Sequence, residues 1–361
     1  MGEHIYLYRR LLVGAYGPPE GSAKGFTVLG HDSSSGTLRT LGAGPELNSP
    51  SFLAFSPDAA VVYATSEQSD GRVSAFRWRR SDVPADPGSF TALGEASTGG
   101  EAPCHVAVHP SGRFLFSANY SSGSVAVHRL SDDGGIGELT DLAEVSGSGP
   151  DPDRQVAPHA HMVAVAPAGH EIAVADLGSD RVWRFGLDRG SGRLSALDPP
   201  LVLPPGSGTR QVLFVDDGRR VVTLGELDGS VAVADWPPRT DATVVSTPGA
   251  TTDLAPGGLA AALVTADGRR FYCSHRGADR IAVLDRQADA VKVVAEFDCA
   301  GAWPRHLSLA GDVLYVANQH SNAVAAIGLR ADGRTPSSVT TATLPSPTCV
   351  LLEPRKDGPS V

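Results

Sequence analysis

An apolar segment that usually ends at a proline or an aspartate recurs along the chain. The clearest copies span residues 52–57, 105–110, 162–167, 211–216 and 261–266, and a shortened sixth copy spans residues 306–310. Each copy is followed by a second apolar segment, which spans residues 61–65 after the first copy and residues 114–118 after the second. Short apolar runs bounded by turn residues are typical of strands, and two runs joined by a tight turn predict a β-hairpin.

A third strand is predicted after a Ser, Gly or Asp turn in each repeat. Its leading residues are Val73, Val125, Val182, Val231, Ile281 and Val324. A weaker fourth strand follows, as at residues 140–145 and 291–297. Four antiparallel strands recurring about every 50 residues predict the blade of a β-propeller, because one such sheet buries both faces only when neighbours stack on it.

The two ends of the chain supply a seventh blade. Residues 349–354 match the first strand, and residues 11–16, 25–30 and 37–41 match the second, third and fourth strands. The sequence therefore predicts an all-β, single-domain, seven-bladed propeller over residues 1–361, whose N- and C-terminal strands share one blade and close the ring. A sandwich of two all-β domains is the alternative, but it does not explain one recurring four-strand unit.

Composition agrees with this fold and excludes some partners. The chain has 41 Gly, 27 Pro and only 19% charged residues, as expected for many short strands and tight turns. Its formal net charge of -10 disfavours nucleic acid and anionic membrane surfaces as partners. Because residues 1–14 lack a continuous apolar signal segment, and no apolar run is long enough to span a bilayer, we expect a cytoplasmic protein, and a monomer.

Candidate functional residues gather at one end of the predicted channel, since the first strand of a blade begins at the edge where the second strand ends. The residues expected where first strands begin are Ser51, Cys104, His161, Arg210, Ala260, Arg305 and Thr348. Those expected where second strands end are Glu67, Asn119, Asp176, Gly225, His275 and Asn318, followed by Gln68, Tyr120, Leu177, Glu226, Arg276 and Gln319. Such a polar cluster is a candidate site because blade packing requires only apolar strands.

Several members also have a purely structural explanation. Asn119, Asp176 and Asn318 stand before turns, where their side chains can bond backbone amides. Glu67 could bridge neighbouring blades, and His105 could be a core histidine. For the arginines at strand ends, function is favoured, because guanidinium groups suit anions.

His159 and His161 lie two residues apart, so they face one side of a strand. Such a pair could ligate zinc with Asp176 or Glu226 as a third ligand. The nearby arginines oppose a cation, and the four cysteines form no CxxC pair, so we expect buried free thiols, no metal and no cofactor. The glycine-rich segments at residues 147–150 and 206–208 are interpreted as loops that lead into first strands rather than as phosphate-binding loops.

From about Val13 to Glu353 the chain resembles the lactonase family of seven-bladed propellers, which includes bacterial 6-phosphogluconolactonases and fungal carboxy-cis,cis-muconate cyclases. The segments that carry the resemblance are residues 103–112, 118–125, 147–150, 158–161, 175–182, 303–306, 317–319 and 345–349. The resemblance implies an active site made of His161, Arg210, Glu226 and either Arg276 or Arg305. The family usually has Asn where this chain has Ser66, Gly225 and His275, and His where it has Gln211.

The leading hypothesis is metal-independent hydrolysis of a sugar lactone, most of all 6-phosphoglucono-δ-lactone, a small anionic substrate. His161 or Glu226 would be the base, Arg210 the oxyanion donor, and Arg276 or Arg305 the phosphate anchor. The remaining predicted substrate contacts are Glu67, His105, Asn119, His159, Asp176 and Asn318, with Asp176 or His159 orienting the base. A muconate-type cyclase or isomerase, and a non-enzymatic binding propeller, are the alternatives.

Overall fold

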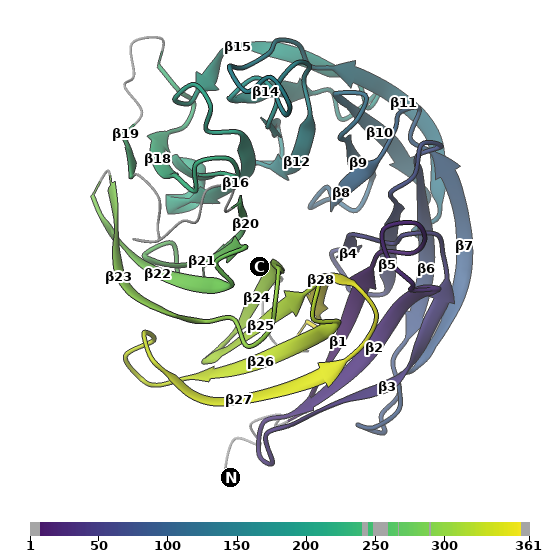
Figure 1. Ribbon diagram of the computed structural model, residues 1–361. Helices are drawn as coiled ribbons and strands as arrows, with labels where there is room; N and C mark the ends of the chain where they lie inside the picture. Colours follow the sequence, from purple (N-terminus) through teal and green to yellow (C-terminus); the bar gives the residue numbers. More distant parts are fainter. Residues whose placement is uncertain (1–7, 240–244, 248–258, 266, 289, 355–361) are drawn as a thin grey trace.

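Seven four-stranded antiparallel sheets are arranged in a ring around one axis, with the first strand of each sheet innermost (Figure 1). The computed structural model describes residues 8–239, 245–247, 259–265, 267–288 and 290–354. The predicted seven-bladed, all-β architecture is confirmed. Within the described ranges the structure contains no helix long and apolar enough to span a bilayer.

The strands take four places in the blades. The first strands are β4 (Leu53–Phe55), β8 (Pro103–Val108), β12 (Ala160–Val165), β16 (Thr209–Val215), β20 (Leu259–Thr265), β24 (Pro304–Ala310) and β28 (Pro347–Leu352). The second strands are β5 (Val61–Ser66), β9 (Phe114–Asn119), β13 (Glu171–Asp176), β17 (Arg220–Gly225), β21 (Arg270–Arg276), β25 (Val313–Asn318) and β1 (Tyr8–Ala15). A short 3-10 turn, η1 (Asp216–Gly218), joins β16 to β17.

The third and fourth strands complete each sheet toward the outside of the ring. The third strands are β6 (Arg72–Arg79), β10 (Ser124–Leu130), β14 (Arg181–Leu187), β18 (Val231–Asp235), β22 (Arg280–Gln287), β26 (Ala323–Leu329) and β2 (Gly25–Asp32). The fourth strands are β7 (Ser89–Ser97), β11 (Ile136–Glu144), β15 (Leu194–Val202), β19 (Val245–Thr247), β23 (Ala290–Asp298), β27 (Pro336–Thr343) and β3 (Thr37–Glu46). We number the blades one to seven by their first strands, from β4 to β28.

Blade seven is built from both ends of the chain, as predicted. Strand β28 pairs antiparallel with β1, so that Leu11 lies opposite Leu352 and Val13 opposite Val350. Beside this pairing, the backbone N–H of Arg10 donates a hydrogen bond of 3.2 Å to the Glu353 carboxylate. Because side chains alternate along a strand, Leu11 and Val13 pack against blade six, whereas Leu12 packs against blade one.

The first strand of most blades carries a β-bulge where it begins. In blades two to seven the pairing with the second strand skips one residue at this point. The skipped residues are Cys104, His161, Arg210, Ala261, Arg305 and Thr348. A bulge leaves its extra residue unpaired and redirects its side chain, a device common beside active sites. The prediction is wrong by one residue in blade five, where Ala261 and not Ala260 takes this position.

The register of blade one also corrects the sequence comparison of second strands. Asn119 pairs with Ser124 and Asn318 with Ala323, five residues on, but in blade one Ser66 pairs with Arg72, six residues on. The hairpin loop of blade one is therefore one residue longer. Ser66 is the counterpart of Asn119, and Glu67 belongs with the residues that follow each second strand, such as Glu226.

Closure of the ring leads to a stability prediction. Leu12 is fully buried between blades seven and one, so Leu12→Ala should lower the free energy of unfolding by about 2–5 kcal/mol, as for other large-to-small core changes. The matched control is Leu139→Ala on β11, whose side chain is 42% exposed and should lose far less. Urea unfolding of both variants measures the difference, and equal losses would contradict the tight packing at this seam.

Candidate active site

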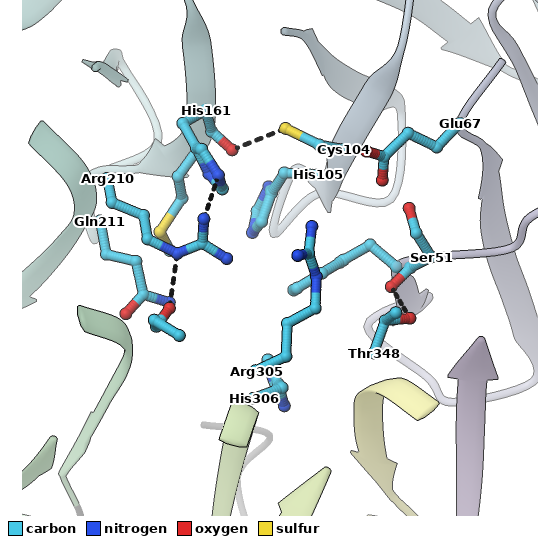
Figure 2. A pocket seen from close by; sticks show the side chains of 13 residues that line it. Ser51, Glu67, Cys104, His105, His161, Arg210, Gln211, Arg305, His306 and Thr348 are labelled. Atoms are coloured by element: carbon cyan, nitrogen blue, oxygen red, sulfur yellow. Dashed lines mark hydrogen bonds between the residues drawn. The ribbon is translucent and has the colours of Figure 1, made fainter. Parts of the chain in front are cut away.

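One polar pocket lies on the axis, and each blade contributes a residue to its wall (Figure 2). These residues are Ser51, Cys104, His161, Arg210, Ala261, Arg305 and Thr348, six of which are the bulged residues described above. The other lining residues are Phe52, Glu67, His105, Met162, Gln211 and His306. The bulges thus explain how the side chains of the six bulged residues are turned toward the axis.

A buried carboxylate gathers three guanidinium groups beside this pocket. Glu226 is 2% exposed, and its Oε2 lies 2.5 Å from Arg210 Nη1 and 3.0 Å from Arg276 Nη2. Its Oε1 lies 2.7 Å from Nη2 of Arg154, which belongs to the loop before β12. Burial alone would raise the pKa of Glu226, but the charges of Arg276 and Arg210 outweigh it and hold that pKa well below the usual 4.5.

His161 is held as a neutral acceptor. Arg210 Nη1 donates a 2.5 Å hydrogen bond to His161 Nε2, so that nitrogen carries a lone pair. Burial and then the charge of Arg210 lower the pKa of His161 well below its usual 6.5. The Nε group of Arg210 donates to the carbonyl oxygen of Ala261 at 2.6 Å, which fixes the guanidinium between two blades.

Three of the lining side chains join neighbouring first strands. His105 Nδ1 accepts from the backbone N–H of Val163 at 3.5 Å, and His306 Nδ1 accepts from that of Val350 at 3.3 Å. Gln211 Oε1 accepts from the N–H of Leu263 at 2.6 Å. The amide oxygen of Gln211 therefore makes the same contact as the two imidazoles in the equivalent positions. Burial first, with nearby positive charge, lowers the pKa of His105 to about 3 and that of His306 to about 4.

The opposite wall of the pocket carries a second polar group from blades six, seven and one. Arg305 Nη2 donates to the Tyr16 hydroxyl at 2.5 Å, and that hydroxyl donates to Glu67 Oε1 at 2.8 Å. The Arg305 guanidinium also lies 4.8 Å from the centre of the Tyr16 ring. Counting Arg154, Arg210, Arg276 and Arg305 against Glu67 and Glu226, four positive charges face two negative ones. The site therefore favours an anion, although the whole chain is acidic.

The structure brings five of the predicted site residues to the pocket wall: Glu67, His105, His161, Arg210 and Arg305. Glu226 and Arg276 stand behind Arg210 rather than on the wall. Arg276 is 4% exposed, and it also donates to the carbonyl oxygen of Ala260 and packs over Trp303. Burial lowers the pKa of Arg276 to about 9, which still leaves it charged at neutral pH.

Asn119, Asp176 and Asn318 are not placed at the pocket, because all three side chains are fully buried beside turns. Asn119 Nδ2 donates to Ser124 Oγ at 3.0 Å, and Asn318 Nδ2 donates to the carbonyl oxygen of Cys299 at 2.9 Å. The Asp176 carboxylate accepts from the backbone N–H groups of His159 and Gly178 and from Ser179 and Trp183. These bonds stabilise the turns, so the substrate-binding roles predicted for these three residues are not supported.

His159 also differs from its predicted role. Its ring stacks on Tyr120 at 4.4 Å, and its Nδ1 bonds to the carbonyl oxygen of Tyr120 at 3.0 Å. The centre of the His161 ring lies 5.7 Å from that of the same Tyr120 ring, with the two ring planes nearly perpendicular. The two imidazoles therefore share an aromatic neighbour, but neither His159 nor Asp176 is hydrogen-bonded to the His161 ring among the described residues, and the orienting role predicted for them is not supported.

The glycine-rich loop at residues 206–208 surrounds a carboxylate of the chain itself. The backbone N–H groups of Gly206 and Gly208 donate to Asp180 at 2.8 and 2.7 Å, and Ser207 Oγ donates at 3.1 Å. The space that could cradle a phosphate is filled by Asp180, which agrees with the interpretation of this segment as a lead-in loop.

Ser66, Gly225 and His275 stand where the family usually has Asn. None of the three is among the residues that line the pocket. Ser66 Oγ donates to the carbonyl oxygen of Asn48 at 2.5 Å. A Cβ at Gly225 would lie 2.4 Å from Asp228 Oδ1 and 2.7 Å from the Ser207 carbonyl oxygen, so this turn requires glycine. His275 is fully buried, and burial lowers its pKa to about 4.

Three site residues escaped the sequence comparison: Tyr16, Tyr120 and Arg154. Tyr120 stands among the residues that follow second strands but is not one of the predicted substrate contacts, and Tyr16 ends the segment of residues 11–16 that matches a second strand. Arg154 lies in a loop and has no counterpart in the strand repeat. The signal that could have found Arg154 is its position in the sequence, a few residues before His159 and His161.

Comparison with known proteins agrees with this geometry. Residues 10–352 match the model of the family described as "Lactonase, 7-bladed beta-propeller". The chain belongs to this family.

The relatives cover most of the chain. A 6-phosphogluconolactonase of Bacillus subtilis is 28% identical, over 94% of this chain and 96% of its own length. A 6-phosphogluconolactonase of Formosa agariphila is 24% identical, over 82% and 86%. The structure of a periplasmic gluconolactonase of Pseudomonas aeruginosa has a TM-score of 0.86 and 26% identity, over 96% of this chain and 99% of that one.

The buried Glu226 cluster leads to a prediction about stability and pH. Glu226→Gln leaves three guanidinium groups without their counter-charge and should lower the free energy of unfolding at pH 7 by about 3–5 kcal/mol. Because the folded pKa is depressed, this contribution is present above the ordinary pKa of 4.5 and is lost as pH falls through the folded pKa. The difference between the two proteins should shrink only below pH 4.5.

Urea unfolding at several pH values measures this effect. The control is Glu138→Gln, which removes a solvent-exposed ion pair with Arg129 and should change stability by no more than about 0.5 kcal/mol. A Glu226→Gln variant as stable as the parent at pH 7 would show that the cluster is not held by its carboxylate.

Proposed function

We propose that the chain hydrolyses a sugar lactone, with 6-phosphoglucono-δ-lactone as the leading candidate. The observation that carries the proposal is the pairing of a neutral imidazole with a fixed guanidinium on the wall of a positively charged pocket. Lactone opening needs a base for water, a donor for the developing oxyanion and a positive anchor for an anionic substrate. The names of the relatives support the same class of reaction.

His161 suits the role of base better than Glu226. Its ring lines the pocket, and its Nε2 lone pair points at Arg210, the group that would hold the substrate carbonyl. Glu226 is nearly inaccessible, and each of its oxygens is held by an arginine, so it is a poor proton acceptor. We therefore assign Glu226 to the positioning of Arg210, Arg276 and Arg154.

The reaction then follows from this arrangement. The lactone carbonyl oxygen competes for the N–H groups of Arg210, which releases the lone pair of His161 Nε2. His161 takes a proton from water while the water oxygen bonds to the carbonyl carbon, and Arg210 stabilises the resulting oxyanion. The tetrahedral adduct breaks its bond to the ring oxygen, which receives the proton from His161, and the open hydroxy acid leaves.

Arg305 suits the role of anchor better than Arg276, because Arg305 lines the pocket and Arg276 does not. A guanidinium binds phosphate through paired hydrogen bonds. Arg154, whose side chain is 33% exposed, provides a further positive group from the neighbouring loop.

Turnover by two variants tests the assignment. His161→Ala and Arg210→Ala should each lower kcat for 6-phosphoglucono-δ-lactone by at least about 100-fold, the usual effect of losing a general base or an oxyanion donor. The controls are His170→Ala and Arg189→Ala, which alter exposed residues. Rates are corrected for spontaneous hydrolysis, and circular dichroism checks the fold. Unchanged turnover in both site variants would refute the mechanism.

The substrate panel separates the rival functions. It contains 6-phosphoglucono-δ-lactone, glucono-δ-lactone and a muconate-type carboxylated lactone. The positive surplus favours the two anionic lactones, whereas activity only on glucono-δ-lactone would assign the arginines to other contacts. A folded protein that turns over none of the three would favour a binding propeller.

Metal independence, a cytoplasmic location and a monomeric state remain predictions. Metal independence is tested by turnover after treatment with a chelator.

The depressed pKa of His161 predicts the pH profile. A base must be unprotonated, and His161 stays so well below pH 6.5 because burial and Arg210 disfavour its charged form. Therefore kcat/KM should stay level from pH 8 down to 6.5 and decline only at lower pH. A decline centred at or above pH 6.5 would show that the base is not the buried His161.

A further inference from the structure

Arg305, Tyr16 and Glu67 form a directed chain of hydrogen bonds. Its two ends, Arg305 and Glu67, line the pocket across from His161 and Arg210 (Figure 2). Three neighbouring blades supply the three residues. The proposed mechanism does not use the Glu67 carboxylate, so the role of this side chain is still to be explained.

The direction of this chain is fixed by the single proton of the phenol. Burial raises the pKa of Tyr16 above its usual 10.0, so the hydroxyl stays protonated. It accepts from Arg305, which has only donors, and must therefore give its own proton to Glu67 Oε1. Tyr16 thus donates a hydrogen bond to one oxygen of the carboxylate and none to the other oxygen, Oε2.

Glu67 Oε2 is shielded from solvent and receives no hydrogen bond from the described residues. A buried carboxylate oxygen without a donor is costly, whereas hydrogen bonds to a charged acceptor are among the strongest in proteins. Glu67 lines the pocket, and its terminal torsion is one of the broad ones. Rotation about that bond could therefore bring Oε2 within reach of a molecule in the pocket.

We propose that Glu67 Oε2 accepts a hydrogen bond from a ring hydroxyl of the bound lactone, and so selects polyhydroxylated lactones over lactones without hydroxyl groups. Tyr16 and Arg305 act as positioning residues for the carboxylate. This inference rests on the proposed function, because it assumes that the lactone occupies the pocket with its carbonyl at Arg210.

A hydroxyl is the donor that fits this position. A phosphate or carboxylate of the substrate would be repelled by Glu67 and has no proton to give it at neutral pH. A lactone without hydroxyls would leave the oxygen unpaired, and a site that hydrogen-bonds a hydroxyl rejects analogues that lack it. The same wall therefore disfavours a hydroxyl-free, muconate-type lactone.

Paired substrates test the proposal. Glu67→Gln keeps the shape of the side chain but removes its charge, and it should lower kcat/KM for glucono-δ-lactone by about 10- to 100-fold. The same substitution should leave kcat/KM for δ-valerolactone, which has no hydroxyl group, within about 2-fold, a difference typical of changes away from the contact. Equal losses on both substrates, or no loss on either, would overturn the proposal.

Two further variants guard against a structural effect. Tyr16→Phe keeps the ring beneath Arg305 but removes the hydroxyl, and it should shift the same ratio in the same direction by a smaller factor, with the change mainly in KM. Glu144→Gln, at an exposed position on β11, is the matched control and should not change the ratio. If Glu67→Gln does not fold, an unchanged ratio in Tyr16→Phe is enough to overturn the proposal.

A binding measurement separates this proposal from the proposed function. Glucono-δ-lactam is a stable analogue that cannot be opened in the same way, and its affinity is measured by calorimetry on the parent protein and on Glu67→Gln. Weaker lactam binding in the variant supports the role of Glu67 even if no lactone is turned over. Lactone hydrolysis with lactam affinity independent of Glu67, or no lactam binding by the parent protein, would reject this role.

Discussion

Closure of the ring by the pairing of β28 with β1 is the constraint on which both the fold and the site depend. It gives every blade two neighbours, so the apolar residues on both faces of β1 are buried. It also carries the chain directly from β1 to Tyr16, between Arg305 of blade six and Glu67 of blade one. The segment that closes the propeller therefore links two side chains that line one wall of the pocket. A blade assembled from one continuous segment would not need to pair a strand near one end of the chain with a strand near the other end.

The opposite wall is organised by one buried charge. Glu226 holds Arg154, Arg210 and Arg276 within hydrogen-bonding distance, and Arg210 in turn contacts His161. Positive charge of this density is stable in the interior only beside a carboxylate. Burial and then the charge of Arg210 keep His161 neutral, and protonation would add a fourth positive group to the cluster. An acidic chain can thus present a local field suited to an anion, since the nearby charges outweigh the distant ones.

The strand repeat was sufficient to predict the seven blades, the shared closing blade and six of the seven residues that begin the first strands at the pocket. Two errors came from single-residue irregularities. The bulge in blade five falls on Ala261, and the longer hairpin in blade one moves Glu67 from the turn-stabilising positions to those facing the channel. Since side chains alternate along a strand, a shift of one residue turns a side chain to the opposite face of the sheet. Arg154 could not be found by comparing strands, because a loop places it.

The residues that depart from the family pattern also fall into two groups, those at turns and one that lines the pocket. Ser66, Gly225 and His275 occupy the positions whose counterparts, Asn119 and Asn318, bond within turns away from the pocket. Gln211 does face the pocket, but its amide oxygen accepts a backbone N–H just as His105 and His306 do. Three of the four changes thus alter how turns are supported, and the fourth keeps its hydrogen bond. The side chains proposed to meet the lactone are of the types that the family pattern implies, so these departures bear on the stability of turns more than on the chemistry of the pocket.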